Sequence, residues 1–260
     1  MRQTTQILIL LIFITLVPAL ADEDANKLIS KYLNQMVRHT ANFSIGIEYY
    51  VKDSSPIHLS FSWKRWVQKE KVSHLIEMQY PNSEAGKRLL VHEYPNGSSD
   101  RFAFRPKSVL KKNVRITGPQ HYRYKKLRIS VQELIGGELP KYTHHLLETK
   151  RLNKKDCYLI ENRLKLLFRN NSDYPRSVIA LSVKNHELVQ WKLYDRDNRL
   201  AKLILPGKIK DIDGVRTITS FRIIDPRRDS TLIFNVKSAD YHPRFNPIIF
   251  EKENLTESIQ

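Results

Sequence analysis

Residues 177–205 read SVIALSVKNHELVQWKLYDRDNRLAKLIL, which divides into three strand-like segments joined by two short polar turns. The segments at 177–183, 187–194 and 199–205 are rich in β-branched, aliphatic and aromatic side chains, which favour strands. The turns at 184–186 and 195–198 contain Asn and Asp, whose side chains bond to nearby backbone groups. This stretch therefore predicts consecutive antiparallel hairpins.

The same pattern continues on both sides of this stretch. Upstream, Phe43, Ile45, Ile47 and Tyr49 alternate with smaller or polar residues, which is the period of a half-buried strand. Residues 25–40 instead place their apolar side chains on one helical face. Further strands are expected at residues 59–64, 74–80, 88–92, 101–104, 143–149, 157–161, 216–224 and 231–237.

These elements predict a mainly β protein with few helices and a single curled antiparallel sheet. An exposed sheet with aromatic residues on one face would aggregate, so the helices are expected to cover that face. A curled sheet under a helical cover leaves an apolar hollow, and such hollows hold hydrophobic ligands.

The first 21 residues predict a cleavable signal peptide. Arg2 precedes an apolar run from Ile7 to Val17, and Ala19-Leu20-Ala21 is a small-residue cleavage site. The run is shorter than the ~20 residues that a transmembrane helix needs, although an uncleaved anchor helix is the alternative. No Cys follows the site, so a lipid anchor is not expected. We therefore expect residues 22–260 to form one domain located in the periplasm.

Composition excludes several classes of protein. One Cys among 260 residues excludes a disulfide framework and a Cys-rich zinc module, and 8 Gly argue against glycine-rich phosphate loops. The 44 Lys and Arg against 27 Asp and Glu give a net charge of +17. For an exported protein this charge indicates an anionic membrane surface or acidic lipid head groups as partner, and not nucleic acid. The alternative is a solvated surface that happens to be basic.

Catalytic and metal-binding motifs are not found in the sequence. It contains neither G-x-S-x-G nor H-E-x-x-H, and the adjacent His144 and His145 point to opposite faces of a strand. Cys157 lies in an apolar strand, where a buried structural thiol is expected. Asp195 and Asp197 belong to a hairpin turn. The sequence thus predicts no enzyme activity, no catalytic residue, no cofactor and no metal site.

Two groups of residues are candidates for binding. Aromatic residues in the predicted strands either line a pocket for acyl chains or only fill the core: Phe61, Trp63, Trp191, Phe221 and Phe234. A basic stretch between residues 109 and 128 has no acidic residue, and it is expected to be a solvated loop before a short capping-box helix at Ser130–Glu133. Its candidates for contact with a membrane or with lipid head groups are Lys111, Lys112, Arg115, Tyr122, Tyr124, Lys125 and Lys126. An ordinary solvated loop is the alternative.

Several short motifs carry a resemblance to a known family. The segments Glu84–Val91 and Asp100–Pro106 resemble its "kG-x-x-LL" and "d-r-x-x-y-x-P" patterns, and Trp191–Leu200 resembles its "v-e-y-y-D-x-x-G-x-l" hairpin. Asn198 replaces the glycine of that hairpin, which a left-handed turn position tolerates. In their order and spacing these motifs resemble the outer-membrane lipoprotein-sorting proteins, the family with the LolA/LolB-like fold.

The resemblance implies an unclosed β-barrel with a helical lid and a hydrophobic interior. It implies a soluble periplasmic carrier that sorts the acyl chains of lipoproteins or envelope lipids toward the outer membrane, without catalytic residues. An inner-membrane transporter and an outer-membrane acceptor are the partners that such a carrier would need. The alternative is a non-catalytic envelope accessory module that docks on a membrane transporter.

Neutralising Lys111, Lys112, Lys125 and Lys126 together is expected to weaken binding to anionic vesicles, because each cation near a charged membrane adds about 1 kcal/mol. The free energy of unfolding should change by less than about 1 kcal/mol, as is usual for surface substitutions. Vesicle co-sedimentation measures the effect, which should fade as salt shortens the screening length to ~3 Å at 1 M. Binding that is insensitive to both salt and the substitutions would exclude this stretch as the membrane-facing element.

Overall fold

A computed structural model describes residues 24–35, 38–106, 114–115, 121–124, 127–130 and 139–256. The predicted signal peptide lies outside these ranges, and so do Lys111, Lys112, Lys125, Lys126 and most of the predicted capping-box helix. The described residues form a mainly β structure, as the sequence predicted, with a helix at residues 24–35 and four short 3₁₀ helices.

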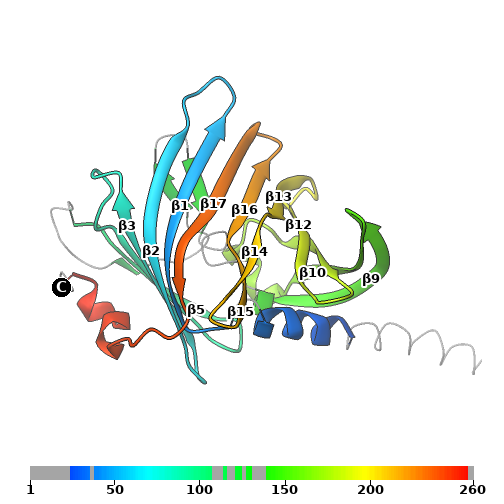
Figure 1. Ribbon diagram of the computed structural model, residues 1–260, viewed down its shortest axis with the longest axis horizontal. Coiled ribbons are helices and arrows are strands. Elements are labelled where there is room, and N and C mark those ends of the chain that lie inside the picture. Colours follow the sequence, from blue (N-terminus) through cyan, green and yellow to red (C-terminus); the bar gives the residue numbers. More distant parts are fainter. Residues whose placement is uncertain are drawn as a thin grey trace, which may run out of the picture.

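The main sheet has 13 antiparallel strands and curls strongly (Figure 1), and its strand order places β6 and β9 at the two edges. Its strand order is β6-β5-β4-β3-β2-β1-β17-β16-β13-β12-β11-β10-β9, so nearly every neighbour in space is also a neighbour in sequence. In chain order the strands are β1 Ala41–Val51, β2 Ile57–Val67, β3 Val72–Tyr80, β4 Arg88–Glu93, β5 Ser99–Phe104, β6 Val114–Arg115, β9 Tyr142–Leu152, β10 Lys155–Leu164, β11 Arg176–Ser182, β12 Leu188–Tyr194, β13 Leu200–Pro206, β16 Ser220–Asp225 and β17 Ser230–Asp240.

One apolar row crosses most of this sheet. Directly paired residues of an antiparallel sheet project from the same face. Pair by pair, the register connects one residue on each of seven neighbouring strands. All of its members are buried: Tyr49, Leu232, Ile223, Ile204, Trp191, Ile179 and Ile160. The register therefore gives the inner face of the curl a continuous apolar surface.

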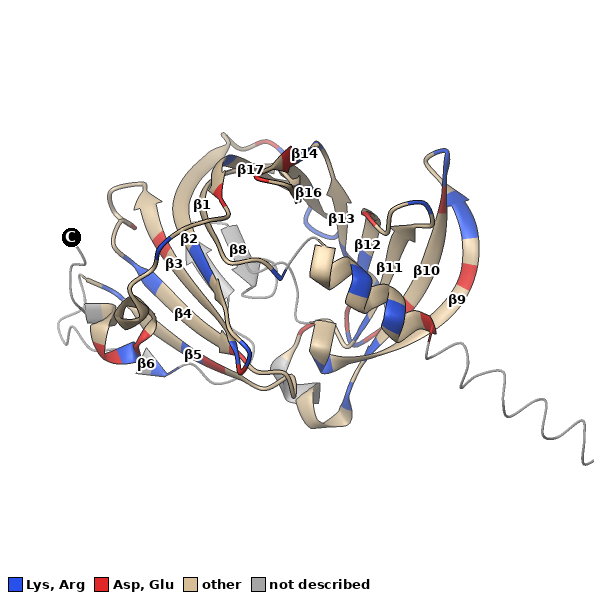
Figure 2. Cartoon of the chain, turned by 60° about the horizontal axis from the view of Figure 1, so that its bottom comes forward, with Lys and Arg blue, Asp and Glu red and all other residues tan. Residues whose placement is uncertain are grey.

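The helix at residues 24–35 covers part of that face. Its apolar side, including Leu28, Ile29 and Tyr32, packs into the same core cluster as the sheet row. Figure 2 shows the sheet curling from β5 to β9, with this helix beside β10–β12. The sequence predicted the helix through Thr40, but residues 38–40 are not helical, and the chain there leads into β1. The helical cover expected from the sequence is thus shorter than predicted.

The outer face of β3–β5 is covered by the C-terminal segment. The 3₁₀ helices η3 (Pro247–Phe250) and η4 (Lys252–Thr256) bury Phe250 and Leu255 against Leu75 and Leu90. Trp66, on the outer face of β2, lies 5.3 Å from the ring of Phe250. This segment gives the sheet a second core on the side opposite the helix at residues 24–35.

Two predicted segments differ from the structure. The single strand expected at 216–224 is split, because Val215–Ile218 (β15) pairs with Ile209–Ile212 (β14) while Ser220–Asp225 (β16) stays in the main sheet. Pro206 lacks an N–H group for the ladder, and the chain leaves the main sheet just after it. The basic stretch was expected to be a loop, but its described parts form strands instead, namely β6, β7 (His121–Tyr124) and β8 (Leu127–Ser130).

The two halves of the curled sheet meet at a contact that we call the seam. There the β4–β5 hairpin touches η1 (Leu139–Lys141), which leads into edge strand β9, and η2 (Leu166–Asn171), which follows β10. Lys141 Nζ lies 3.3 Å from Ser99 Oγ. A Cβ atom on Gly97 would lie 3.2 Å from Pro140 O and 3.3 Å from the ring of Phe168. Close approach across the seam thus requires glycine at this position.

Gly97→Ala is expected to destabilise the protein more than Gly214→Ala does. Both glycines have a positive φ, +85° and +78°, which costs an alanine about 1–2 kcal/mol. Only Gly97 is crowded, since nothing lies within 4 Å of a Cβ on Gly214, and overpacking adds roughly 1–3 kcal/mol. Urea denaturation of both variants measures the difference. Equal losses would show that the seam is not tightly packed.

Candidate functional site

The five predicted cavity aromatics all belong to the inner-face cluster, but they differ in burial. Phe61, Trp191 and Phe234 are buried, with 0%, 3% and 1% of their surface exposed. Trp63 and Phe221 are only partly buried at the border of this cluster. Phe221 stacks on Phe234 with ring centroids 4.4 Å apart. Phe61, Trp191 and Phe234 thus fill the core, while Trp63 and Phe221 keep surface within reach of a ligand; a ligand role for any of the five remains a prediction.

Trp63 is hydrogen-bonded to a row of polar side chains on the neighbouring strands, formed by His74 and Glu93. Its indole Nε1–H donates to His74 Nδ1 at 3.2 Å, and the two rings stack with centroids 5.8 Å apart. An indole can only donate, so His74 carries its proton on Nε2 and donates it to the Glu93 carboxylate at 3.0 Å. This row fixes the orientation of the Trp63 ring on the inner face.

Sequence reasoning missed a buried cation next to Trp63. Arg65 is 3% exposed, and its guanidinium lies 5.2 Å and 5.3 Å from the ring centroids of Phe43 and Trp63. Its Nε donates to the His39 carbonyl at 2.7 Å, which ties β2 to the segment that follows the helix. Burial lowers the pKa of Arg65 to about 10 and raises the pKa of Tyr32 to about 12. The sequence signal was a charge two residues after Trp63, on the same face of the strand.

Three neighbouring residues on the outer face have the side-chain types of a hydrolase triad, but they do not have its arrangement. Ser73, His92 and Asp100 are paired across β3, β4 and β5, and Ser73 Oγ lies 2.9 Å from His92 Nδ1. Ser73 is 0% exposed, so no substrate reaches its hydroxyl in this conformation. Asp100 instead bonds to Tyr94 at 3.0 Å and to Arg115 at 2.6 Å. The row acts as packing, and it places the predicted membrane residue Arg115 in an ion pair.

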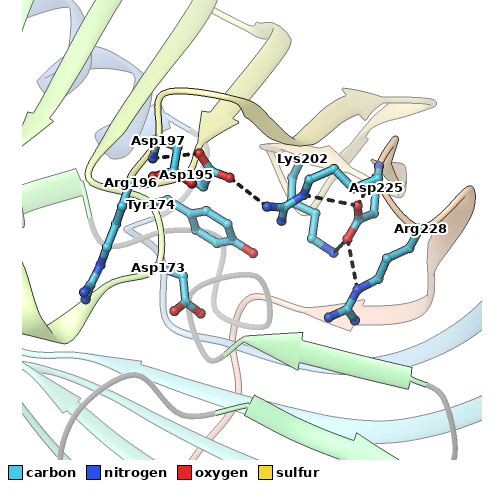
Figure 3. Close-up of a pocket in the computed structure, with 9 residues that line it drawn as sticks. Asp173, Tyr174, Asp195, Arg196, Asp197, Lys202, Asp225 and Arg228 are labelled. Atoms are coloured by element: carbon cyan, nitrogen blue, oxygen red, sulfur yellow. Dashed lines mark hydrogen bonds and ion pairs between the residues drawn. The ribbon is translucent and has the colours of Figure 1, made fainter.

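A cleft of about 560 Å³ lies between the β12–β13 and β16–β17 turns (Figure 3). The Asp195 carboxylate accepts backbone N–H bonds from Asp197 and Arg199 at 3.0 Å and 2.9 Å, and these hold its pKa below the usual range. Asn198 has φ +59°, which confirms the left-handed turn position. Asp195 and Asp197 thus stabilise a hairpin turn, as predicted.

Ion pairs connect the two turns and the strands next to them at this cleft. Asp225, 2% exposed, lies 3.2 Å from Lys202 and 3.8 Å from Arg228, and Arg227 donates to Asp195 at 2.8 Å (Figure 3). The lining includes four acidic and four basic residues, so the cleft has no excess charge with which to select an ion. Its side chains clamp the turns together.

Residues considered for metal or thiol chemistry have structural partners. His144 Nδ1 lies 2.7 Å from Asn162 Oδ1, while His145 projects from the other face. Cys157 is buried in a small apolar cluster, and burial raises the pKa of its thiol. Within the described ranges, no three His, Cys, Asp or Glu side chains gather as metal ligands, and no helix is long and apolar enough to cross a membrane.

Solved structures with the same architecture define the class. A domain described as an outer membrane lipoprotein-sorting protein, from Vibrio parahaemolyticus, matches with a TM-score of 0.79 and 16% identity over 91% of this chain and 100% of that one. A DUF1329 family protein from Desulfovibrio piger gives 0.77 and 18% over 90% and 99%. A LolA superfamily protein from Nitrosomonas europaea gives 0.73 and 15% over 88% and 98%. The protein therefore has a LolA-like fold.

A family comparison agrees with this class. Residues 70–257 match a family model described as "-like: Uncharacterized protein", and this match spans well over half of the chain. The chain belongs to that family, and its fold is LolA-like, which confirms the resemblance seen in the sequence. No curated protein matches the sequence significantly.

The stability of the protein is expected to fall as the pH drops from 6.5 toward 4, in part because of His92. Burial lowers the pKa of His92 from 6.5 to about 4. In this window the unfolded chain therefore binds a proton that the folded protein does not, which favours unfolding. His92→Gln should flatten this slope, whereas His58→Gln, at an exposed position, should not. Urea denaturation at several pH values measures both, and parallel slopes for the parent and His92→Gln would contradict the prediction.

Proposed function

We propose that this protein is a periplasmic carrier that binds acyl chains of lipoproteins or envelope lipids against the inner face of its sheet. The observation that carries the proposal is the apolar row from Tyr49 to Ile160, which crosses seven strands beneath a short helix. The LolA-like fold supports the same function, since one matching structure is described as an outer membrane lipoprotein-sorting protein. The carrier would move its cargo toward the outer membrane.

The partly buried members of the cluster are the proposed contacts for acyl chains. Trp63, Phe221, Leu146 and Ile218 border the buried core from different strands. Burial of an acyl chain gains about 0.8 kcal/mol per CH₂, so two C16 chains would gain a gross ~20 kcal/mol if they were fully buried. A carrier must release its cargo, and incomplete coverage by a short helix keeps the affinity below that limit.

The partly polar end of the inner face would orient the cargo. Arg65, His74 and Glu93 lie at the end of the face that is close to the β2–β3 turn, whereas the apolar row lies farther along the sheet. Acyl chains are therefore expected at the partly buried residues that border the apolar row, with polar groups kept away from them, because an unpaired polar group on an apolar surface is costly.

Trp63→Ala is expected to weaken binding of a fluorescent fatty acid roughly tenfold, because the lost indole contact is worth at least 1.4 kcal/mol. Trp66→Ala is the matched control, since Trp66 lies on the opposite face of the same strand. Its loss of stability should be similar, about 3–5 kcal/mol at most, while fatty-acid affinity should stay within about twofold of the parent.

Mass spectrometry of the protein purified from a periplasmic extract identifies the cargo. Co-purified phospholipid, fatty acid or acylated peptide is the expected result. A protein that carries no lipid and binds neither fatty acid nor acylated peptide would contradict carriage. Equal loss of affinity in Trp63→Ala and Trp66→Ala would show that the first acts only through stability.

A further inference from the structure

Two adjacent leucines project from η2 into solvent. Leu166 is 72% exposed and Leu167 is 85% exposed, whereas the other large apolar side chains that are exposed in the described ranges reach at most 53%. We call this pair the leucine tip. Isolated exposed apolar residues are common on protein surfaces, but adjacent and almost fully exposed leucines are a feature that a binding partner would explain.

The structure holds the leucine tip outward. Phe168, the next residue, is 7% exposed and packs with Tyr142 and Leu164 in a small core of its own. The backbone N–H of Lys165 donates to the Lys141 carbonyl at 3.0 Å, and its Nζ donates to the Pro140 carbonyl at 3.0 Å. The segment is anchored on both sides of the two leucines. They cannot turn inward unless Phe168 leaves its core.

The position of the tip is also fixed. Gly97 of the β4–β5 hairpin contacts Phe168, so the tip stands on the seam, where the two halves of the sheet meet. At this place the residues that flank the tip contact the β4–β5 hairpin and η1. An exposed apolar pair whose flanking residues are held in this way can enter a soft surface without rearrangement of those contacts.

Charge and size favour a lipid bilayer as that surface. Residues 164–172 read LKLLFRNNS, with two cations and no acidic residue, in a chain of net charge +17. Two side chains supply only a fraction of the roughly 800 Å² that each partner buries in a stable protein interface. A bilayer needs no complementary pocket, and basic residues beside inserted leucines are the usual composition of elements that bind at a membrane surface.

We propose that Leu166 and Leu167 insert into the surface of an anionic phospholipid bilayer and dock the protein there by the seam. Lys165, at the base of the tip, faces the level of the lipid head groups when the leucines are inserted. This docking goes beyond acyl-chain carriage and does not depend on it, because the tip lies outside the inner-face cluster.

Vesicle binding by the full mature chain tests the proposal. Vesicles of phosphatidylethanolamine with phosphatidylglycerol are the probe, and binding is followed by flotation. The double variant Leu166→Ser with Leu167→Ser is expected to bind roughly tenfold more weakly or worse, because both inserted apolar side chains are lost. The matched control combines Leu147→Ser and Ile248→Ser, two positions 51% and 50% exposed on other parts of the chain, and it should bind within about twofold of the parent.

A fluorescent label reports insertion directly. Cys157 is buried, so in a Cys157→Ala background Leu167→Cys carries an environment-sensitive dye, and Leu147→Cys is the control position. A blue shift on vesicles at position 167, with none at 147, is expected. A parent protein that does not bind these vesicles, a double serine variant that binds as tightly as the parent, or a dye at 167 that stays in water would each overturn the proposal.

Fatty-acid binding without vesicles separates this proposal from carriage. The double serine variant should keep the parent's fatty-acid affinity while losing vesicle binding. Vesicle binding through the tip in a protein that binds no acyl chain would remove carriage and leave the docking proposal standing.

Discussion

The cross-strand register of the main sheet is the constraint on which the rest of the structure depends. Each pair places one apolar side chain beside the next, and the row from Tyr49 to Ile160 keeps a single face apolar across seven strands. A shift of one residue in any of these strands would turn its apolar set outward. The helix at residues 24–35 packs on that apolar face, and the buried aromatic rings belong to the same cluster. The curl of the sheet brings these residues together.

Much of this arrangement was predictable because its signals are local. Alternating hydrophobicity identified most strands and hairpins, and the left-handed position of Asn198 followed from its place in a polar turn. The split at Thr219 was not predicted, because residues 216–224 contain no Gly or Pro to mark a break and the split depends on where β13 ends. β7 and β8 pair as antiparallel strands, where the run of positive charge had indicated a loop.

The candidate site was harder to predict from the sequence than the fold, because the sequence pattern does not report burial. A period of two says which residues share a face, but it does not say how deeply each is buried. Phe61 and Trp63 share the inner face, yet only Trp63 keeps partly exposed surface. Arg65 was overlooked because a charged residue in a strand is usually expected to face solvent. In this structure the rings of Phe43 and Trp63 lie next to its guanidinium instead. The leucine tip escaped notice because a short apolar run normally indicates burial.

The seam has a mechanical consequence for the interior. Neighbouring strands of the sheet are joined by ladders of backbone hydrogen bonds, whereas the contacts at the seam include a side-chain bond from Lys141 and the packing of Gly97 against Phe168. Parting these contacts breaks no ladder, so the girth of the curled sheet can change at a cost far below that of separating two strands. A curled sheet whose described edge strands are not paired with each other can change its inner diameter while the pairing of its strands, and therefore the set of residues on its inner face, stays the same.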